Sequence, residues 1–235
     1  MNKLIINILY KFGLLPFAQV IYVYYKNFIY KKKIAKIQVA WRSLNKHNYT
    51  FAANTINEMH FPLDKVTVGK HCYGPLCVHH FGTVGEKLQI ASFCSISIGV
   101  KFILGGNHSI STFSTFPFRH FFNNQECEAW TKGPIIVEDD VWIGTDAIIL
   151  SGVNLRKGTV VAAGSIVTES SLPYSLIGGN PAKLIKLRFD NAIIKALMDI
   201  DFEKIDEKRI LSLLPKLYMP LNEKLLVEIK NELLK

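Results

Sequence analysis

Residues 105 to 118, GGNHSISTFSTFPF, place a histidine among side chains that suit a reactive loop. His108 follows two glycines, which let the backbone bend freely, and Asn107, Ser111 or Thr112 could orient its imidazole ring. Histidine exchanges a proton near neutral pH, so His108 is a candidate general base. On residue type alone, the simpler interpretation is a surface histidine or a hydrogen-bonding tether.

The other reactive residue types show weaker patterns. Four cysteines form no CxxC pair, so we expect free thiols in a reducing compartment. Adjacent His79 and His80 should point to opposite faces of a strand, and His120 lacks the setting of His108, so we expect structural roles for these histidines. The cysteines are Cys72, Cys77, Cys94 and Cys127.

An aliphatic residue recurs at every sixth position on both sides of this loop. Neither the helical period of 3.6 nor strand alternation of 2 produces such a pattern. A hexad fits a chain that makes a short strand, turns a corner and repeats, so that three hexads form one triangular coil and stacked coils form parallel strands. The in-register positions are Val66, Cys72, Val78, Val84, Ile90, Ile96 and Phe102, then Val137, Ile143, Ile149, Leu155, Val161 and Val167.

The sixfold register stops between Phe102 and Val137, which predicts an inserted loop over residues 103–136. A loop longer than about fifteen residues is usually functional. Because side chains fill the interior of such a prism, a ligand groove must lie outside it. We therefore expect this loop to form one wall of a pocket.

Outside the repeats the sixfold pattern gives way to helical patterns, so the sequence predicts three regions. Residues 1–50 form a hydrophobic, basic helical extension, residues 51–188 the β-helix with its loop, and residues 189–235 a helical tail. Asp190 is a candidate N-cap of the first tail helix. Pro215 and Pro220 are expected to separate the helical pieces.

The charge is unevenly distributed. The chain has 28 Lys and Arg against 19 Asp and Glu, a net charge of +9, and the region before Glu58 contains no acidic residue. Residues 12–25 are apolar but shorter than the roughly 18 residues needed to span a bilayer. We expect a cytoplasmic protein whose N-terminal helix packs on the protein or its oligomer; the alternative is peripheral contact with the inner membrane face through residues 12–36. No nucleic-acid-reading motif accompanies the basic residues, so we predict no nucleic-acid partner.

From about Val66 onward the chain resembles the hexapeptide-repeat acyltransferases with a left-handed parallel β-helix. The stretches that carry the resemblance are NHSISTFSTFPF, VEDDVWIGTDAIILSGV, VVAAGSIVT and IGGNPAKLIKLRF. They are most similar to the xenobiotic acetyltransferase branch, which contains chloramphenicol and streptogramin acetyltransferases and also enzymes that acetylate bacterial glycans. The resemblance implies acetyl transfer from acetyl-CoA to an acceptor hydroxyl, without a metal, in a homotrimer with sites between neighbouring prisms.

The resemblance also implies roles for individual residues. His108 matches the catalytic base, and Asn107 lies beside it as a substrate-binding residue. Trp142 would line the groove for acetyl-CoA and acceptor, although packing between subunits explains an outward tryptophan nearly as well. Three further predicted cofactor-binding residues have small side chains that leave room for the coenzyme along the groove: Gly144, Ala162 and Ala163. Lys183 is predicted to bind the phosphates of the coenzyme, and Lys186 is a further candidate for that role.

Two features of the chain differ from the drug-modifying acetyltransferases and bear on the choice of acceptor. The N-terminal extension is foreign to that pattern, and the tail reads DIDFEKID where that branch is commonly rich in tryptophan. With the basic charge and the aromatic loop, these departures favour a sugar or surface-polysaccharide hydroxyl as acceptor. The alternatives are an antibiotic acceptor, a γ-carbonic-anhydrase-like zinc enzyme built on His71, His79, His80 or His108, and a non-enzymatic glycan-binding β-helix.

Overall fold

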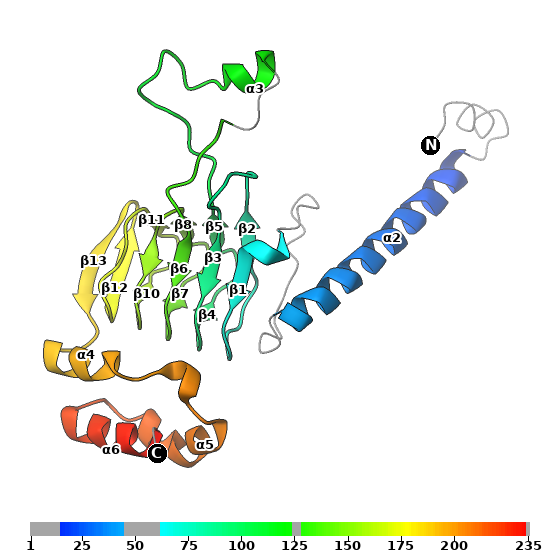
Figure 1. Ribbon diagram of the computed structural model, residues 1–235. Helices are drawn as coiled ribbons and strands as arrows, with labels where there is room; N and C mark the ends of the chain where they lie inside the picture. Colours follow the sequence, from blue (N-terminus) through cyan, green and yellow to red (C-terminus); the bar gives the residue numbers. More distant parts are fainter. Residues whose placement is uncertain (1–14, 45–61, 124–127, 234–235) are drawn as a thin grey trace. The chain divides into compact units, whose positions relative to one another are not determined.

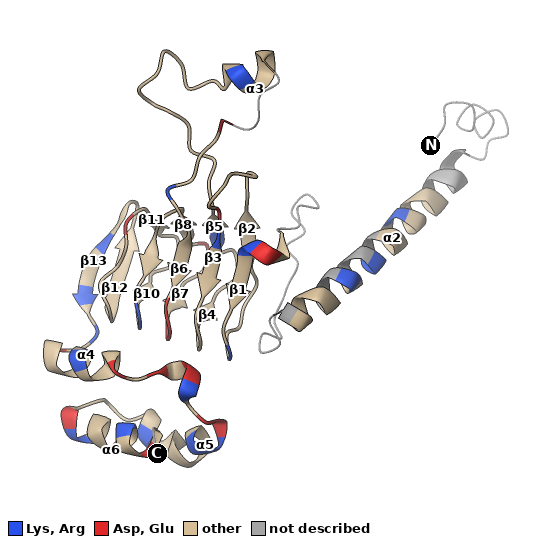
Figure 2. Ribbon diagram, in the orientation of Figure 1, with Lys and Arg blue, Asp and Glu red and all other residues tan. Residues whose placement is uncertain are grey.

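The computed structural model describes residues 15–44, 62–123 and 128–233, which fall into one unit up to Ser43 and a second from Leu44 onward. In the first unit, α2 (Leu15–Leu44) is one continuous helix of 30 residues. The consecutive residues from Val20 to Tyr25 are all exposed, so apolar side chains surround the helix rather than lining one face. Figure 2 shows its basic residues further along the helix, with no acidic residue. Across the described ranges, no helix has the length and hydrophobicity needed to cross a bilayer.

The second unit is built on short strands that form three sheets, one for each face of a triangular prism (Figure 1). The sheet orders are β1-β3-β6-β9, β11-β8-β5-β2 and β13-β12-β10-β7-β4. The strands are β1 (Val66–Val68), β2 (Cys77–His79), β3 (Leu88–Ile90), β4 (Ser95–Ile96), β5 (Lys101–Ile103), β6 (Ile135–Val137), β7 (Trp142–Ile143), β8 (Ile148–Leu150), β9 (Asn154–Leu155), β10 (Val160–Val161), β11 (Ile166–Val167), β12 (Ser175–Gly179) and β13 (Ala182–Leu187).

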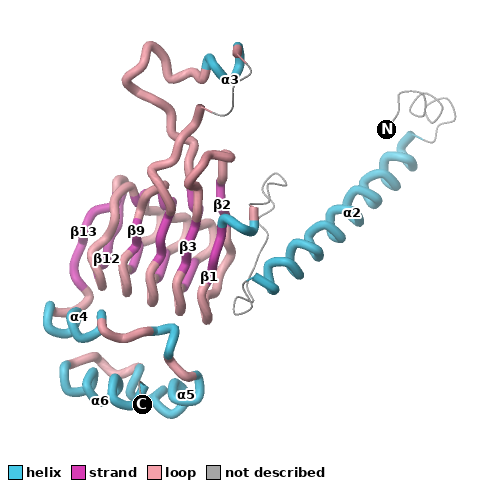
Figure 3. The backbone as a smooth tube through the Cα atoms, in the orientation of Figure 1, coloured by secondary structure: helices cyan, strands magenta, loops and turns pink. Residues whose placement is uncertain are grey.

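The hexad repeat explains this architecture. Ile143 of β7 pairs in parallel with Val161 of β10, eighteen positions and therefore three hexads later. Figure 3 shows the strands of successive coils stacked side by side. Both aliphatic side chains are fully buried, because every sixth residue points into the prism. The fold is a left-handed parallel β-helix, as the sequence predicts, closed at its C-terminal end by an antiparallel pairing of β12 with β13.

Val84 is the exception to the register, and the prediction that it points inward is wrong. Its side chain is 98% exposed, whereas the other in-register residues are buried. Between β2 and β3 the chain forms a turn instead of a strand, with positive φ angles at Gly82 and Gly85. Glu86 follows this turn, and its side chain is fully buried and pairs with Lys65.

The chain leaves the prism after β5 and returns at β6. Asn107 and Trp130 form an antiparallel bridge across the neck of this excursion, with two backbone hydrogen bonds of 3.0 Å. The outer part contains the short helix α3 (Phe118–Phe122). Figure 1 shows the loop extending from one edge of the prism and the C-terminal helices lying along the opposite edge.

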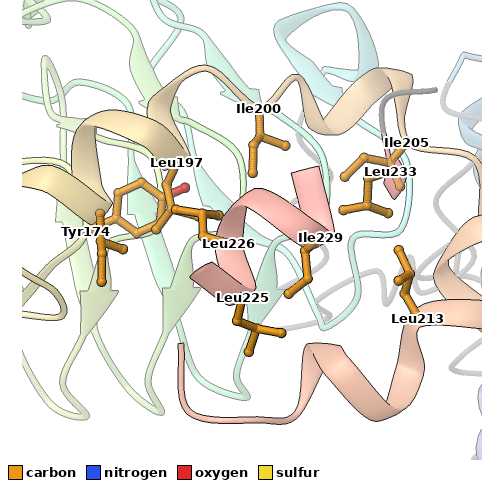
Figure 4. Packing of buried hydrophobic residues seen from close by; sticks show 10 residues of the cluster. Tyr174, Leu197, Ile200, Ile205, Leu213, Leu225, Leu226, Ile229 and Leu233 are labelled. Atoms are coloured by element: carbon orange, nitrogen blue, oxygen red, sulfur yellow. The ribbon is translucent and has the colours of Figure 1, made fainter. Parts of the chain in front are cut away.

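Three helices follow the prism: α4 (Asn191–Met198), α5 (Glu207–Leu217) and α6 (Glu223–Leu233). Asp190 caps α4 by accepting a 2.9 Å hydrogen bond from the Ile193 amide, as predicted. Pro215, by contrast, lies inside α5, so the prediction that it separates two helices is wrong; α5 continues for only two residues beyond it. The helices bury one apolar cluster with Tyr174 of the prism (Figure 4).

Two prism lysines connect this helical tail to the β-helix. The buried Lys157 ammonium donates to the carbonyls of Met198, at 3.2 Å, and Ile200. Lys70 donates to the Ile205 carbonyl at 2.8 Å. The Met198 and Ile200 carbonyls lie at the C-terminal end of α4, where backbone acceptors lack helical partners and where positive charge is favourable, while Ile205 follows the short 3-10 helix of residues 202–204.

Candidate active site

His108 lies on the loop, just beyond its neck, with an exposed side chain. Its Nδ1 is 2.9 Å from the Thr115 carbonyl oxygen. Because a carbonyl only accepts hydrogen bonds, Nδ1 must carry the proton in this contact, and a neutral ring then keeps its lone pair on Nε2. The loop thus holds the imidazole in the tautomer whose Nε2 can accept a proton.

Asn107 positions the base of the loop. Its amide nitrogen Nδ2 donates to the Trp130 carbonyl at 3.0 Å and to Ser151 Oγ, on the prism, at 3.2 Å. One of these bonds closes the neck of the loop, and the other holds the neck against the prism. The predicted contact between Asn107 and substrate remains a prediction, and the geometry gives this residue a positioning role for the adjacent His108.

The two glycines before Asn107 are packed against the Glu86 turn. A Cβ atom on Gly105 would lie 2.5 Å from Glu86 Oε1. At Gly106, which has a φ of +82°, a Cβ atom would lie 2.8 Å from the Phe81 ring. Flexibility therefore does not explain these glycines: they permit a close approach that only a residue without a side chain can make. This contact sets where the chain enters the loop, two residues before His108.

Glu86 is a buried anchor that sequence reasoning did not find. Its carboxylate accepts from the Lys65 ammonium at 3.0 Å and from the amides of Phe81, at 2.8 Å, and Gly82, at 3.1 Å. Burial alone would raise the pKa of Glu86, but the hydrogen bonds from Lys65 and from the Phe81 amide hold that pKa below its usual value. The only signal in the sequence was a Gly-x-x-Gly-Glu segment at the place where the hexad pattern falters.

The loop encloses a pocket of roughly 340 Å³ that His108 helps to line. One wall is aromatic and includes Phe116 and Phe118, whose rings meet edge-on with centroids 5.0 Å apart. Phe121 stacks on Phe116 with centroids 5.1 Å apart but does not line the pocket. The other lining groups include hydroxyls and one charge of each sign, from Ser109, Thr112, Ser114, Arg119 and Glu128. His108 thus shares a pocket with aromatic faces and a few polar groups, the usual composition of a small-molecule site.

The predicted cofactor-binding residues lie on the prism. Trp142, on β7, is 53% exposed and projects outward, as its place in the hexad predicts. Gly144 is buried, and a Cβ atom there would lie 2.7 Å from the Ala163 amide nitrogen, so coil stacking already accounts for this glycine.

The other predicted cofactor-binding residues are more accessible. Ala162 is half-buried and Ala163 exposed at the next corner, and Lys183 is exposed on β13. Lys183 forms only a solvent-exposed 3.4 Å ion pair with Glu169. The coenzyme contacts of these residues remain predictions.

Among the described histidines outside the loop, His71 and His79 have local partners, whereas the buried Nδ1 of His80 has none among the described residues. His71 Nε2 lies 3.1 Å from Glu207, and His79 Nε2 lies 3.4 Å from the Cys77 thiol. Burial, and then the charge of Lys101, lower the pKa of His79. Within the described ranges, no three His, Cys, Asp or Glu side chains are grouped as metal ligands. Cys72, Cys77 and Cys94 are free thiols, as predicted, while Cys127 lies outside the described residues.

Known proteins match the same part of the chain. Residues 134–169 match the family model described as the hexapeptide repeat of succinyl-transferase. A probable macrolide acetyltransferase of Lysinibacillus sphaericus is 40% identical over 131 residues, which cover 53% of this chain and 73% of that protein. The chain belongs to the hexapeptide-repeat acetyltransferases.

Further relatives of this acetyltransferase carry related names. A chloramphenicol acetyltransferase of Klebsiella aerogenes is 37% identical over 141 residues, 56% of this chain and 66% of that protein. A virginiamycin A acetyltransferase of Staphylococcus aureus is 37% identical over 144 residues, 59% of this chain and 66% of that protein. A solved hexapeptide-repeat acetyltransferase of Vibrio cholerae aligns with 26% identity and a TM-score of 0.48 over 66% of this chain and 81% of that chain.

Membership of this family makes the protein an enzyme that uses acetyl-CoA as its acetyl donor. The residues of the outer prism corner fit such a donor. Nothing lies within 4 Å of where a Cβ atom would stand on Gly164, so the exposed corner formed with Ala163 is flat and open. Lys183 and Lys186 add exposed positive charge on β13, suited to phosphate groups.

Proposed function

We propose that this acetyltransferase moves the acetyl group of acetyl-CoA to a hydroxyl group of a small, largely apolar acceptor of the xenobiotic type, with His108 as general base. The single observation that carries this proposal is the Nδ1 contact of His108 with the Thr115 carbonyl. It leaves Nε2 as the proton acceptor in a pocket with an aromatic wall.

The proposed reaction needs one proton relay. As the acceptor oxygen bonds to the thioester carbonyl carbon, His108 Nε2 takes the hydroxyl proton; the carbon–sulfur bond then breaks, and the same proton passes to the thiolate. The positive charge that forms on the imidazole is delocalised, and the Thr115 carbonyl accepts from it at Nδ1. No covalent intermediate on the enzyme is required.

This xenobiotic-type acceptor differs from the sugar or surface-polysaccharide hydroxyl that the sequence features favoured. The relatives named above are a macrolide, a chloramphenicol and a virginiamycin A acetyltransferase. Their names support the antibiotic alternative better than the glycan acceptor. The cluster of Phe116, Phe118 and Phe121, of which the first two line the pocket, also supports an acceptor with an apolar body.

A glycan hydroxyl is the second candidate acceptor. The observation that favours it is the polar part of the loop pocket, where Ser109, Thr112 and the charged Arg119 and Glu128 lie beside aromatic rings. Aromatic faces bind the apolar faces of sugar rings while polar groups bind their hydroxyls.

The test is release of free coenzyme thiol against an acceptor panel of a macrolide, chloramphenicol, virginiamycin A, nucleotide-linked sugars and an acidic polysaccharide. We expect turnover with at least one apolar drug, and a loss of about two or more orders of magnitude in His108→Ala. His120→Ala is the matched control, because His120 lies in the same loop but outside the pocket lining. Unchanged turnover in His108→Ala contradicts the base assignment, and turnover with glycans alone selects the second candidate.

We further propose a cytoplasmic homotrimer, in which Trp142 on the outer face of the prism meets a neighbouring subunit. For α2, exposed apolar residues on every side support burial by protein over contact with a membrane surface, since an interfacial helix concentrates its apolar residues on one face. Pelleting the protein with anionic phospholipid vesicles tests this choice, and we expect the protein to stay in the supernatant.

A further inference from the structure

A second cavity lies away from the loop, between the prism and the C-terminal helices. It measures roughly 590 Å³, which is within the usual range for a site that takes a drug-sized molecule. Its lining combines Phe93 and Tyr174 of the prism with apolar side chains of α4, α5 and α6. His108, the Phe116 cluster and the predicted coenzyme residues are absent from this lining.

A buried polar atom in the lining has no partner. Tyr174 is 1% exposed, and its hydroxyl has no hydrogen-bond partner among the described residues. Figure 4 shows this hydroxyl directed toward the part of the apolar cluster formed by Leu197 and Leu226. A buried hydroxyl without a partner carries a free-energy cost that a bound ligand can relieve.

The ionic groups at the cavity already satisfy each other. Arg188 donates to Asp140 Oδ2 at 3.2 Å and to the Gly158 carbonyl at 2.6 Å, and its guanidinium lies over the Tyr174 ring at 5.5 Å. A charged ligand would have to compete with this pair. The cavity therefore favours a neutral molecule.

The unpartnered hydroxyl defines the polar group of that molecule. Burial, and then the negative charge of Asp140, raise the pKa of Tyr174 above its usual range. The hydroxyl therefore keeps its proton, and it can donate a hydrogen bond. Its complement is a carbonyl or ether oxygen.

We propose that the cavity between the prism and helices α4 to α6 is a second binding site, which takes a neutral, largely apolar molecule with one oxygen that accepts a hydrogen bond from Tyr174. We place its entrance at the C-terminal end of α5 and the turn that follows, where the lining residues Leu214, Tyr218 and Met219 are 40%, 86% and 56% exposed. The site is independent of acetyl transfer, because none of its residues is assigned to that reaction.

Benzophenone and diphenylmethane form a matched pair of probes for this site. They share two phenyl rings and differ in the carbonyl that the Tyr174 hydroxyl would engage. We expect the wild-type protein to bind benzophenone about five- to tenfold more tightly than diphenylmethane by calorimetry, the contribution of one buried hydrogen bond. On irradiation, the benzophenone carbonyl abstracts hydrogen from a nearby C–H group and the two carbon radicals join. We expect mass spectrometry to find this adduct in residues 197–233.

Two variants make the test decisive. Tyr174→Phe should bind both probes with equal affinity and should unfold at the same or a higher temperature, because it removes an unpartnered polar atom. Leu214→Trp should block both probes by filling the entrance while acetyl transfer continues. The proposal is overturned if benzophenone does not bind, if its advantage over diphenylmethane survives in Tyr174→Phe, or if the adduct forms in the His108 loop.

Discussion

At the scale of single residues, the position of the proposed base depends on groups that do no chemistry. The hydrogen bond from His108 Nδ1 to the Thr115 carbonyl, seven residues along the same loop, fixes the tautomer of the His108 ring. The loop in turn starts from Gly106, which packs on Phe81, and from Asn107, which is bonded to the prism through Ser151. Small changes in these supporting contacts would displace the His108 ring and lower the activity.

Gly106→Ala tests whether the start of the loop positions His108. Gly82→Ala is a matched control, because both glycines have a φ of +82° and only the Cβ atom at 106 meets the Phe81 ring. Each substitution should lower the free energy of unfolding by about 1–2 kcal/mol through backbone strain. Gly106→Ala alone should also reduce kcat, by about tenfold or more, in the thiol-release assay. Equal kcat values for the two variants would show that this contact does not position the base.

Glu86→Gln tests the buried anchor and its pH dependence. The pKa of Glu86 lies below its usual value of about 4.5 in the folded protein, so its stabilisation is present above that value and is lost as pH falls through the lowered pKa. We expect the variant to be about 2–3 kcal/mol less stable than wild type at pH 7, by urea unfolding at a fixed protein concentration. The difference should narrow below pH 4.

The control for Glu86→Gln is Glu169→Gln, which removes the exposed ion pair with Lys183. Exposed pairs contribute little, so this control should match wild type at both pH values. A difference at Glu86 that stays constant with pH would rule out the lowered pKa as its cause.

At the scale of elements, the helical tail is fastened to the prism by side chains that reach its free carbonyls. Lys157 is buried and donates to Met198 and Ile200, so it acts as a cap from outside the helix. Burial lowers the pKa of Lys157, which nevertheless lies near the carboxylates of Asp139 and Asp201. The tail cluster around Leu213, Leu226 and Ile229 therefore depends on the prism for its attachment as well as on its own packing.

Lys157→Met should loosen α4 without disturbing the β-helix. The two carbonyls lose their buried donor, and we expect a loss of about 1–3 kcal/mol in the free energy of unfolding. Hydrogen exchange should accelerate in residues 191–205 and stay unchanged in the strands. Lys204→Met is the control: Lys204 pairs only with the exposed Asp201, and exchange should not change. Protection of residues 191–205 that is equal in wild type and Lys157→Met would contradict the capping role.

At the scale of the whole molecule, the outer faces of the prism carry exposed apolar residues that a neighbouring subunit would cover. Tyr73 is 59%, Ile98 72% and Trp142 53% exposed. For the proposed homotrimer, sedimentation equilibrium should give three times the chain mass of 26.6 kDa. Trp142→Glu should shift this mass toward the single chain. A wild-type protein that sediments as a monomer would contradict the trimer.

The sequence by itself determined the repeat. Because each inward position recurs every six residues and is almost always apolar, the hexads specify both the prism and its parallel pairing, and the break in the hexads located the loop with His108. The pattern also indicated the outward Trp142 and the cap at Asp190. These features depend on local spacing, which a sequence displays directly.

Only the tertiary structure decided how the loop is supported and where the second cavity lies. Val84 keeps the hexad spacing, yet it is exposed, because the chain between β2 and β3 turns instead of forming a strand, in a segment whose Glu86 is buried against Lys65. Pro215 has the residue type of a helix breaker, yet it lies inside α5. The unpartnered Tyr174 hydroxyl arises where α4 and α6 fold back against the prism. Each of these outcomes depends on contacts between residues distant in the chain, which spacing alone does not encode.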